Sequence, residues 1–221
     1  QLSQVVLLDS DFTNLPQVVM EGRRVIHHVT RTAQVFFIKT IYSLLVSLFC
    51  LLANQPFPFI PIQITLVDAC IEAYPSFLTI WEANIRRIQG KFLPTALSHA
   101  APFGLAVTGM IVILSLWAPF SAAERQTVMY LLLILISMAA VAKSCIPMNP
   151  LRVFLCVTMA GGTFLALAIL PSLFEVAAVT PAMGLTVLAG AAVSLLSLAA
   201  WEQARRRAEN RVKKPRGART V

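Results

Sequence analysis

The stretch VMYLLLILISMAAVA, residues Val128–Ala142, contains no charged residue, no glycine and no proline. A helix of about 20 predominantly apolar residues is long enough to cross the hydrocarbon core of a lipid bilayer. Five further apolar stretches occur in the chain, near Val35–Ala53, Ile62–Trp81, Ala101–Pro119, Val153–Leu170 and Met183–Trp201. The sequence therefore predicts an all-α, polytopic membrane helix bundle with six transmembrane helices between residues 35 and 201.

The overall composition indicates a membrane protein. Of the 221 residues, 57% are hydrophobic and 13% are charged, whereas about 25% of the residues in a soluble domain are charged. The net charge is +8, but the basic residues occur in short clusters between the apolar stretches. We therefore expect the lipid bilayer, and not a nucleic acid, as the partner of this chain. The four cysteines have no CxxC spacing and indicate neither a disulfide framework nor a zinc site.

The basic clusters occupy alternate segments between the apolar stretches. They precede the first stretch, follow the second, lie between the fourth and fifth, and follow the sixth. The loops on the opposite side contain a single basic residue, Arg125. Outside the C-terminal tail they comprise Arg23, Arg24, Arg31, Arg86, Arg87, Lys91, Lys143 and Arg152. Because Lys and Arg collect in cytoplasmic loops, both termini of this chain are predicted to be cytoplasmic.

The flanks of the apolar region differ from it in character. Residues 14–34 are predicted to form a cytoplasmic stalk helix that runs into the first span, with a surface-lying amphipathic helix as the alternative. Residues 202–221 are rich in Arg and Lys and are predicted to form a basic cytoplasmic tail. Because the chain begins with Gln1 instead of Met, inside what reads as a strand containing Val5–Leu8, we expect more of the protein upstream.

Three charged residues lie inside the predicted spans. Lys39 is in the first span, and Asp68 and Glu72 are in the second. An ionisable side chain at bilayer depth is costly and typically faces the protein interior, where it marks an ion pathway. Asp68 and Glu72 are four residues apart and therefore share one face of a helix. This face predicts a cation site.

Hydroxyl groups extend the predicted site. Thr65 continues the face of the two carboxylates, and Thr40 and Ser43 lie beside Lys39 in the first span. Carboxylate and hydroxyl oxygens suit Ca²⁺, Mg²⁺ or Mn²⁺, or a protonatable relay. One alternative is an ion pair between Lys39 and one acid, which would leave the other carboxylate over. Lys39 would otherwise act as a built-in counter-cation for the transported ion.

Two regions, the first made of two neighbouring runs, carry a resemblance to a known family. Residues 9–16 read DSDFTNLP and residues 19–29 read VMEGRRVIHHV, while residues 59–68 read FIPIQITLVD. The first two resemble the end of the phosphorylation domain and the stalk of the P-type cation-transporting ATPases. The third is similar to the opening of the sixth membrane helix of these pumps.

The resemblance implies an organisation and a site. Residues 1–13 would be the end of the phosphorylation domain, and residues 35–201 would be helices five to ten of the parent pump. Asp68 and Glu72 match ion ligands of calcium-type pumps. Lys39 and the run Tyr74–Phe77 resemble the bacterial E-type subgroup linked to calcium uptake. This implies a divalent cation such as Ca²⁺ and the plasma (inner) membrane of a bacterium.

The catalytic motifs of the family do not occur in these 221 residues. The sequence contains no DKTGT, TGES or PEGL motif. The resemblance therefore implies that Mg-ATP binds to actuator, nucleotide-binding and phosphorylation domains outside this chain, which is expected not to hydrolyse ATP alone. Two other functions fit the same residues: half of a proton-coupled secondary transporter, with Asp68 and Glu72 as proton relays, and a non-transporting membrane scaffold.

Overall fold

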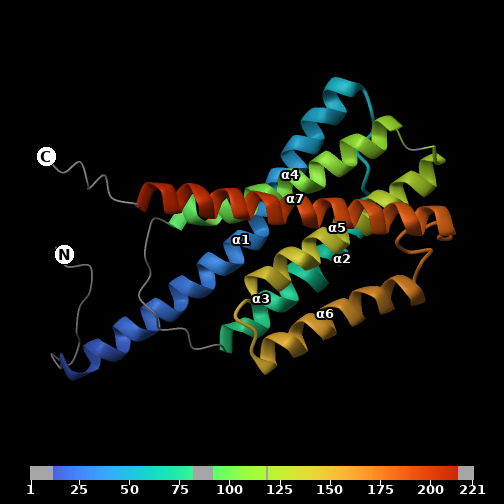
Figure 1. Cartoon of the computed structure of the whole chain (residues 1–221). Helices are drawn as coiled ribbons and strands as arrows, with labels where there is room; N and C mark the ends of the chain where they lie inside the picture. The colour runs from blue at the N-terminus through green and yellow to red at the C-terminus, as the bar shows by residue number, and fades with distance from the viewer. Residues whose placement is uncertain (1–11, 82–91, 118, 214–221) are drawn as a thin grey trace, which may run out of the picture.

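The computed structural model describes residues 12–81, 92–117 and 119–213, with side chains up to residue 207 apart from that of Trp81. Most of the predicted end of the phosphorylation domain, the basic cluster at Arg86, Arg87 and Lys91, and the last part of the basic tail lie outside the described residues. Within the described residues the chain forms helices and loops without a strand (Figure 1). The predicted all-α class is confirmed.

Five of the described helices are long and apolar enough to cross a membrane. They are α1 (Leu15–Ala53), α4 (Phe92–Trp117), α5 (Ala122–Ser144), α6 (Pro150–Ile169) and α7 (Pro181–Lys213). The remaining predicted span, Ile62–Trp81, is divided into four short elements: α2 (Pro61–Leu66), η2 (Val67–Ala73), α3 (Tyr74–Leu78) and η3 (Thr79–Trp81). We call these four elements together the broken helix.

Helix α1 joins the predicted stalk to the first span without interruption. It follows a short 3₁₀ turn, η1 (Phe12–Asn14), and its 39 residues correspond to a rod of about 58 Å at the rise of an α-helix. It ends where Asn54 adopts the left-handed conformation, with φ of 50°, which asparagine tolerates better than most residues. The N-terminal half extends away from the other helices (Figure 1).

The broken helix owes its irregularity to its own sequence. Pro61 starts it at a position where the missing N–H of proline is harmless. Pro75 lies inside it and cannot donate the backbone hydrogen bond of a regular α-helix. Immediately before Pro75 the backbone adopts a π-helical turn over η2, and the N–H of Tyr74 donates to the carbonyl of Ala69, five residues earlier. Both predicted carboxylates lie in this π-helical turn, a feature that is frequent at functional sites.

Helix α5 forms the centre of the bundle. It contacts α1, α4, α6, α7 and η2, and its buried residues include Tyr130, Leu132, Leu133 and Ile134. The most extensive contact between two helices is that of α1 with α4. Gly104 makes this contact possible, because a Cβ atom at this position would lie 2.6 Å from Cγ2 of Ile41.

Candidate cation site

Lys39 and Asp68 connect α1 to the π-helical turn. The Nζ of Lys39 donates to Oδ2 of Asp68 at 2.5 Å, and the two side chains are 33% and 36% exposed. The ion pair expected as an alternative to an ion site is therefore present. The second carboxylate oxygen, Oδ1 of Asp68, is buried and has no hydrogen-bond partner among the described residues. Pairing with Lys39 thus satisfies half of this carboxyl group.

Glu72 is the carboxylate that does not pair with Lys39. It lies one turn beyond Asp68 in η2 and is 3% exposed, and its Oε2 is buried without a hydrogen-bond partner in the described part of the chain. It lies within electrostatic range of both Asp68 and Lys39. Because buried polar groups in folded proteins are nearly always hydrogen-bonded, these unpaired carboxylate oxygens call for an explanation beyond packing.

Tyr42 is a third oxygen donor that the sequence argument missed. It follows Lys39 by three residues on α1, a spacing that places both side chains on the same face. Tyr42 is 1% exposed, its buried Oη has no hydrogen-bond partner among the described residues, and it lies within electrostatic range of Glu72 and Asp68. The spacing from Lys39 was the signal in the sequence that could have identified it.

The three predicted hydroxyl ligands have other partners in this arrangement. Thr40 and Thr65 are exposed, and each donates to the backbone carbonyl four residues earlier, at 3.2 Å and 3.0 Å respectively. Ser43 donates to the carbonyl three residues earlier at 3.3 Å. The structure therefore brings together Lys39, Tyr42 and the two acids but does not bring these hydroxyls to them. Their role as ion ligands stays a prediction.

A small cavity lies beside Glu72, between α1, the broken helix and α5. Arg31, Ser76, Thr79 and Ser144 are among the residues that line it with Glu72. A larger cavity next to it shares Arg31, Thr79 and Ser144. Polar side chains therefore extend from Glu72 towards the end of the bundle at which the exposed half of α1 begins.

Gln63 holds the beginning of the broken helix in place. It is fully buried, its Nε2 donates to the carbonyl of Phe174 at 2.9 Å, and its backbone carbonyl accepts from Oη of Tyr130 at 3.0 Å. Its Oε1 accepts from the N–H of Ile60 at 3.3 Å. Sequence reasoning assigned no role to Gln63, although a glutamine at the third position of a helix is a capping signal.

Chemically, this arrangement provides part of a hard-cation site. Ca²⁺ takes about six to eight oxygen ligands, and no group of three or more His, Cys, Asp or Glu residues is placed to hold a metal ion in the described part of the chain. Asp68, Glu72 and Tyr42 present three buried oxygens without hydrogen-bond partners among the described residues. A complete site therefore requires further ligands.

Comparison with known proteins identifies the family. No protein-family model matches the chain. It is 35% identical over 215 residues to the probable cation-transporting ATPase exp7 of Streptococcus pneumoniae, a match that covers 89% of this chain and 28% of that protein. The chain is a relative of the P-type cation-transporting ATPases.

Further P-type ATPase relatives match a shorter part of the chain. The calcium-transporting ATPase CtpE of Mycobacterium tuberculosis is 38% identical over 116 residues, which is 48% of this chain and 15% of that protein. A calcium-transporting ATPase of Bacillus subtilis is 28% identical over 76 residues. The chain thus spans about a quarter of the length of the ATPase exp7, and the resemblance expected from the sequence is confirmed.

Proposed function

We propose that this P-type ATPase relative forms part of the membrane region of an ATP-driven cation pump and supplies part of its intramembrane ion site. The observation that carries the proposal is the pair of acids in the π-helical turn, each with a buried carboxylate oxygen that lacks a partner among the described residues. The proposed cargo is Ca²⁺ or another divalent cation. Two carboxylates and a phenol are hard oxygen donors, which favour these ions, and relatives named as calcium-transporting support Ca²⁺.

In this proposal Asp68 and Glu72 bind the cation and Lys39 is the counter-cation. A divalent ion between the two carboxylates repels the ammonium group of Lys39, so ion binding breaks the contact of Lys39 with Asp68. The return of Lys39 to Asp68 restores a fixed positive charge at the site and favours release of the ion. Small rotations of α1 and the broken helix would add Thr40, Ser43 and Thr65 as ligands.

In the proposed pump, ATP hydrolysis takes place in domains outside this chain. Mg-ATP would be hydrolysed by actuator, nucleotide-binding and phosphorylation domains, of which residues 1–13 would be the end. Residues 14–34 would be the stalk, residues 35–201 the membrane region and residues 202–221 the cytoplasmic tail. The uninterrupted α1 would transmit movement from the cytoplasmic domains to Lys39 in a bacterial plasma membrane, with both termini of this chain in the cytoplasm.

The test is ion-dependent phosphorylation of a full-length pump that carries this region. Asp68→Asn and Glu72→Gln should each weaken the apparent ion affinity by about tenfold or more, since each removes a charged ligand. Nucleotide binding should be unchanged. Glu175→Gln is the matched control, because Glu175 is an exposed acid in the loop between α6 and α7, and it should leave ion affinity unchanged.

The same assay separates an ion site from a structural ion pair. If Asp68 only pairs with Lys39, the combination of Lys39→Met with Asp68→Asn should restore full ion-dependent phosphorylation. If Asp68 is a ligand, the double variant remains impaired. Ion affinity equal to that of the unmodified pump in both single acid variants would refute the proposed site.

A further inference from the structure

The π-helical turn sets the direction in which the two acids point. A π-helical turn accommodates one residue more than an α-helical turn, and one residue corresponds to about 100° around the axis of an α-helix. The orientations of Asp68 and Glu72 relative to the rest of the broken helix therefore depend on this turn being kept. Two tyrosine hydroxyl groups form hydrogen bonds at its two ends.

Tyr130 of α5 contacts the broken helix where the π-helical turn begins. It is fully buried, and its Oη donates to the backbone carbonyl of Gln63 at 3.0 Å. The same carbonyl accepts from the N–H of Val67, the first residue of η2. Tyr130 therefore binds to a carbonyl that takes part in the helical hydrogen bonding at the boundary between α2 and η2.

The side chain of Gln63 adds to this attachment. Its Oε1 accepts from Nε2 of Gln126 at 3.4 Å, and Gln126 belongs to α5. Its Nε2 donates to the carbonyl of Phe174 at 2.9 Å, in the loop between α6 and α7. This loop is itself connected to α5, because the N–H of Ala177 donates to Oγ1 of Thr127 at 3.0 Å. The start of the broken helix is thus attached to α5 both directly and through the loop.

Tyr74 holds the other end of the π-helical turn. Its N–H closes the turn by donating to the carbonyl of Ala69, and its Oη lies 2.7 Å from Oγ1 of Thr158 in α6. The hydroxyl of Thr158 has one hydrogen, which it donates to the carbonyl of Phe154 at 2.8 Å. Tyr74 is therefore the donor to Thr158, and the end of the turn is attached to α6.

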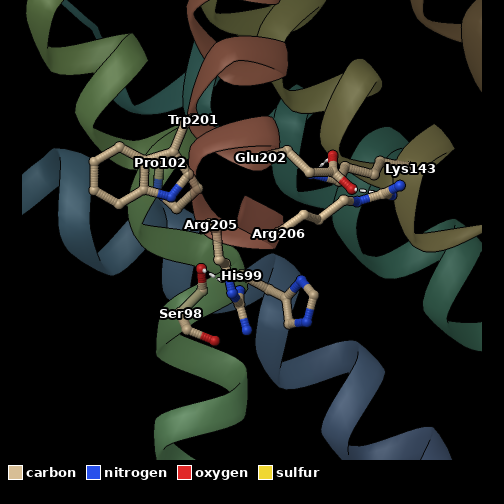
Figure 2. A pocket seen from close by; sticks show the side chains of 8 residues that line it. All are labelled: Ser98, His99, Pro102, Lys143, Trp201, Glu202, Arg205 and Arg206. Atoms are coloured by element: carbon tan, nitrogen blue, oxygen red, sulfur yellow. Dashed lines mark hydrogen bonds and ion pairs between the residues drawn. The ribbon is translucent and has the colours of Figure 1, made fainter. Parts of the chain in front are cut away.

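The contacts at the C-terminal end of α5 are of a different kind. Lys143 contacts Glu202 of α7 at 2.8 Å, and Glu202 contacts Arg206 at 2.6 Å (Figure 2). These ion pairs join α5 to α7, which are both continuous helices, and they involve no residue of the broken helix. The hydrogen bonds of Tyr130 and Tyr74, in contrast, join both ends of the π-helical turn to neighbouring helices.

We propose that Tyr130 and Tyr74 are positioning residues of the proposed cation site, because their hydroxyl groups hold the π-helical turn that orients the two acids. This inference rests on the proposed function, since it concerns the ion that the acids bind. If one of these hydrogen bonds is lost, the turn relaxes in a larger fraction of the molecules. The apparent ion affinity then falls with the fraction that keeps the binding geometry.

The experiment measures phosphorylation of a full-length pump that carries this region as a function of Ca²⁺ concentration. Tyr130→Phe and Tyr74→Phe remove the hydroxyl and keep the ring. Each should weaken the apparent Ca²⁺ affinity by about fivefold, which corresponds to the loss of one hydrogen bond. Nucleotide binding and the phosphorylation level at saturating Ca²⁺ should be unchanged. A merely structural role would lower the maximal level without shifting the half-saturating concentration.

Thr158 tests the same hydrogen bond from the side of α6. Thr158→Val should weaken the apparent Ca²⁺ affinity as much as Tyr74→Phe does, because both variants remove one bond. The double variant should be no weaker than either single variant. Thr158→Ser keeps the hydroxyl and should bind Ca²⁺ like the unmodified pump.

Two control variants change contacts away from the π-helical turn. Thr163→Val removes a fully buried hydroxyl of α6 that donates to the carbonyl of Met159 at 2.8 Å. Glu202→Gln weakens the ion pairs of Figure 2. Both should keep the Ca²⁺ affinity of the unmodified pump.

The acid variants of the same pump separate this inference from the proposed function. Unchanged Ca²⁺ affinity in Tyr130→Phe and Tyr74→Phe, together with a loss in Asp68→Asn and Glu72→Gln, would overturn the positioning role and leave the cation site standing. Unchanged affinity in both acid variants would refute the cation site and the positioning role together.

A general loosening of the bundle is also distinguishable. A loss of Ca²⁺ affinity in Thr163→Val and Glu202→Gln equal to that in the tyrosine variants would overturn the positioning role. Tyr74 and Thr158 are half-buried, so Tyr74→Phe and Thr158→Val are expected to fold even if loss of the buried Tyr130 hydroxyl destabilises the pump.

Discussion

Helix α5 and the broken helix are in contact within the bundle, yet they are built in opposite ways. Helix α5 is continuous from Ala122 to Ser144, and two of its buried polar side chains have backbone partners: Thr127 donates to the carbonyl of Ala123 at 3.0 Å and Tyr130 to that of Gln63 at 3.0 Å. The broken helix is interrupted, and both of its acids have a buried oxygen without a partner in the described structure.

This difference in hydrogen bonding indicates that α5 stabilises the bundle and that the broken helix serves the function. In a bilayer no water is available to replace a missing hydrogen bond, so polar groups must be satisfied within the protein. An unsatisfied buried polar group costs about 1–3 kcal/mol. The packing around α5 offsets this cost. We infer that the broken helix retains these groups for the ion that it is proposed to bind.

The largest expected change comes from weakening α5. Leu133 is 1% exposed, and Leu133→Ala should lower the free energy of unfolding of the chain by about 2 kcal/mol because it leaves a cavity. Unfolding in mixed micelles with increasing sodium dodecyl sulfate measures this change. Leu185 is 70% exposed, and Leu185→Ala should be nearly neutral. Equal losses in the two variants would contradict the central role of α5.

A change of opposite sign is expected in the broken helix. Glu72→Met replaces a buried acid by an apolar side chain of similar length and should raise the free energy of unfolding by about 1 kcal/mol. The same unfolding assay measures the gain. Glu202, in contrast, forms ion pairs with Lys143 and Arg206, so Glu202→Met should destabilise the chain. A destabilised Glu72→Met chain would mean that Glu72 supports the fold.

The smallest expected effect concerns the pair of Lys39 with Asp68. A double-mutant cycle of Lys39→Met and Asp68→Asn should give a coupling energy of about 0.5–1 kcal/mol, because polar contacts between membrane helices typically contribute about this much. The unfolding free energies of the four chains provide this value. A coupling energy indistinguishable from zero would show that the ion pair does not connect α1 to the broken helix.

Much of the fold could be predicted because hydropathy is a local property. The apolar stretches predicted six membrane segments, and five of them correspond to helices among the described residues that are long and apolar enough to cross a membrane. The break in the second predicted span, Ile62–Trp81, was not predicted, although Pro75 was visible in the sequence. A proline removes one backbone donor, but the way in which neighbouring residues rearrange around it depends on the helices packed against them.

The candidate site was predictable only in part, for a related reason. Ionisable residues inside apolar stretches are conspicuous, so Lys39, Asp68 and Glu72 could be identified without a structure. Tyr42 and Gln63 were missed because tyrosine and glutamine are common at helix positions of many kinds. The importance of Tyr42 arises from its burial near the two acids, and that of Gln63 from hydrogen bonds to residues that are distant in the sequence.

The sequence by itself determined that this is an all-α membrane protein with acids inside it, because apolar length and charge are properties of consecutive residues. Only the tertiary structure decided that Lys39 pairs with Asp68, that Glu72 is left over, and that Gln63 connects the broken helix to Phe174. It also decided that Arg24, Arg31 and Arg152 line one cavity. Each of these contacts joins segments far apart in the chain, and their proximity results from helix packing.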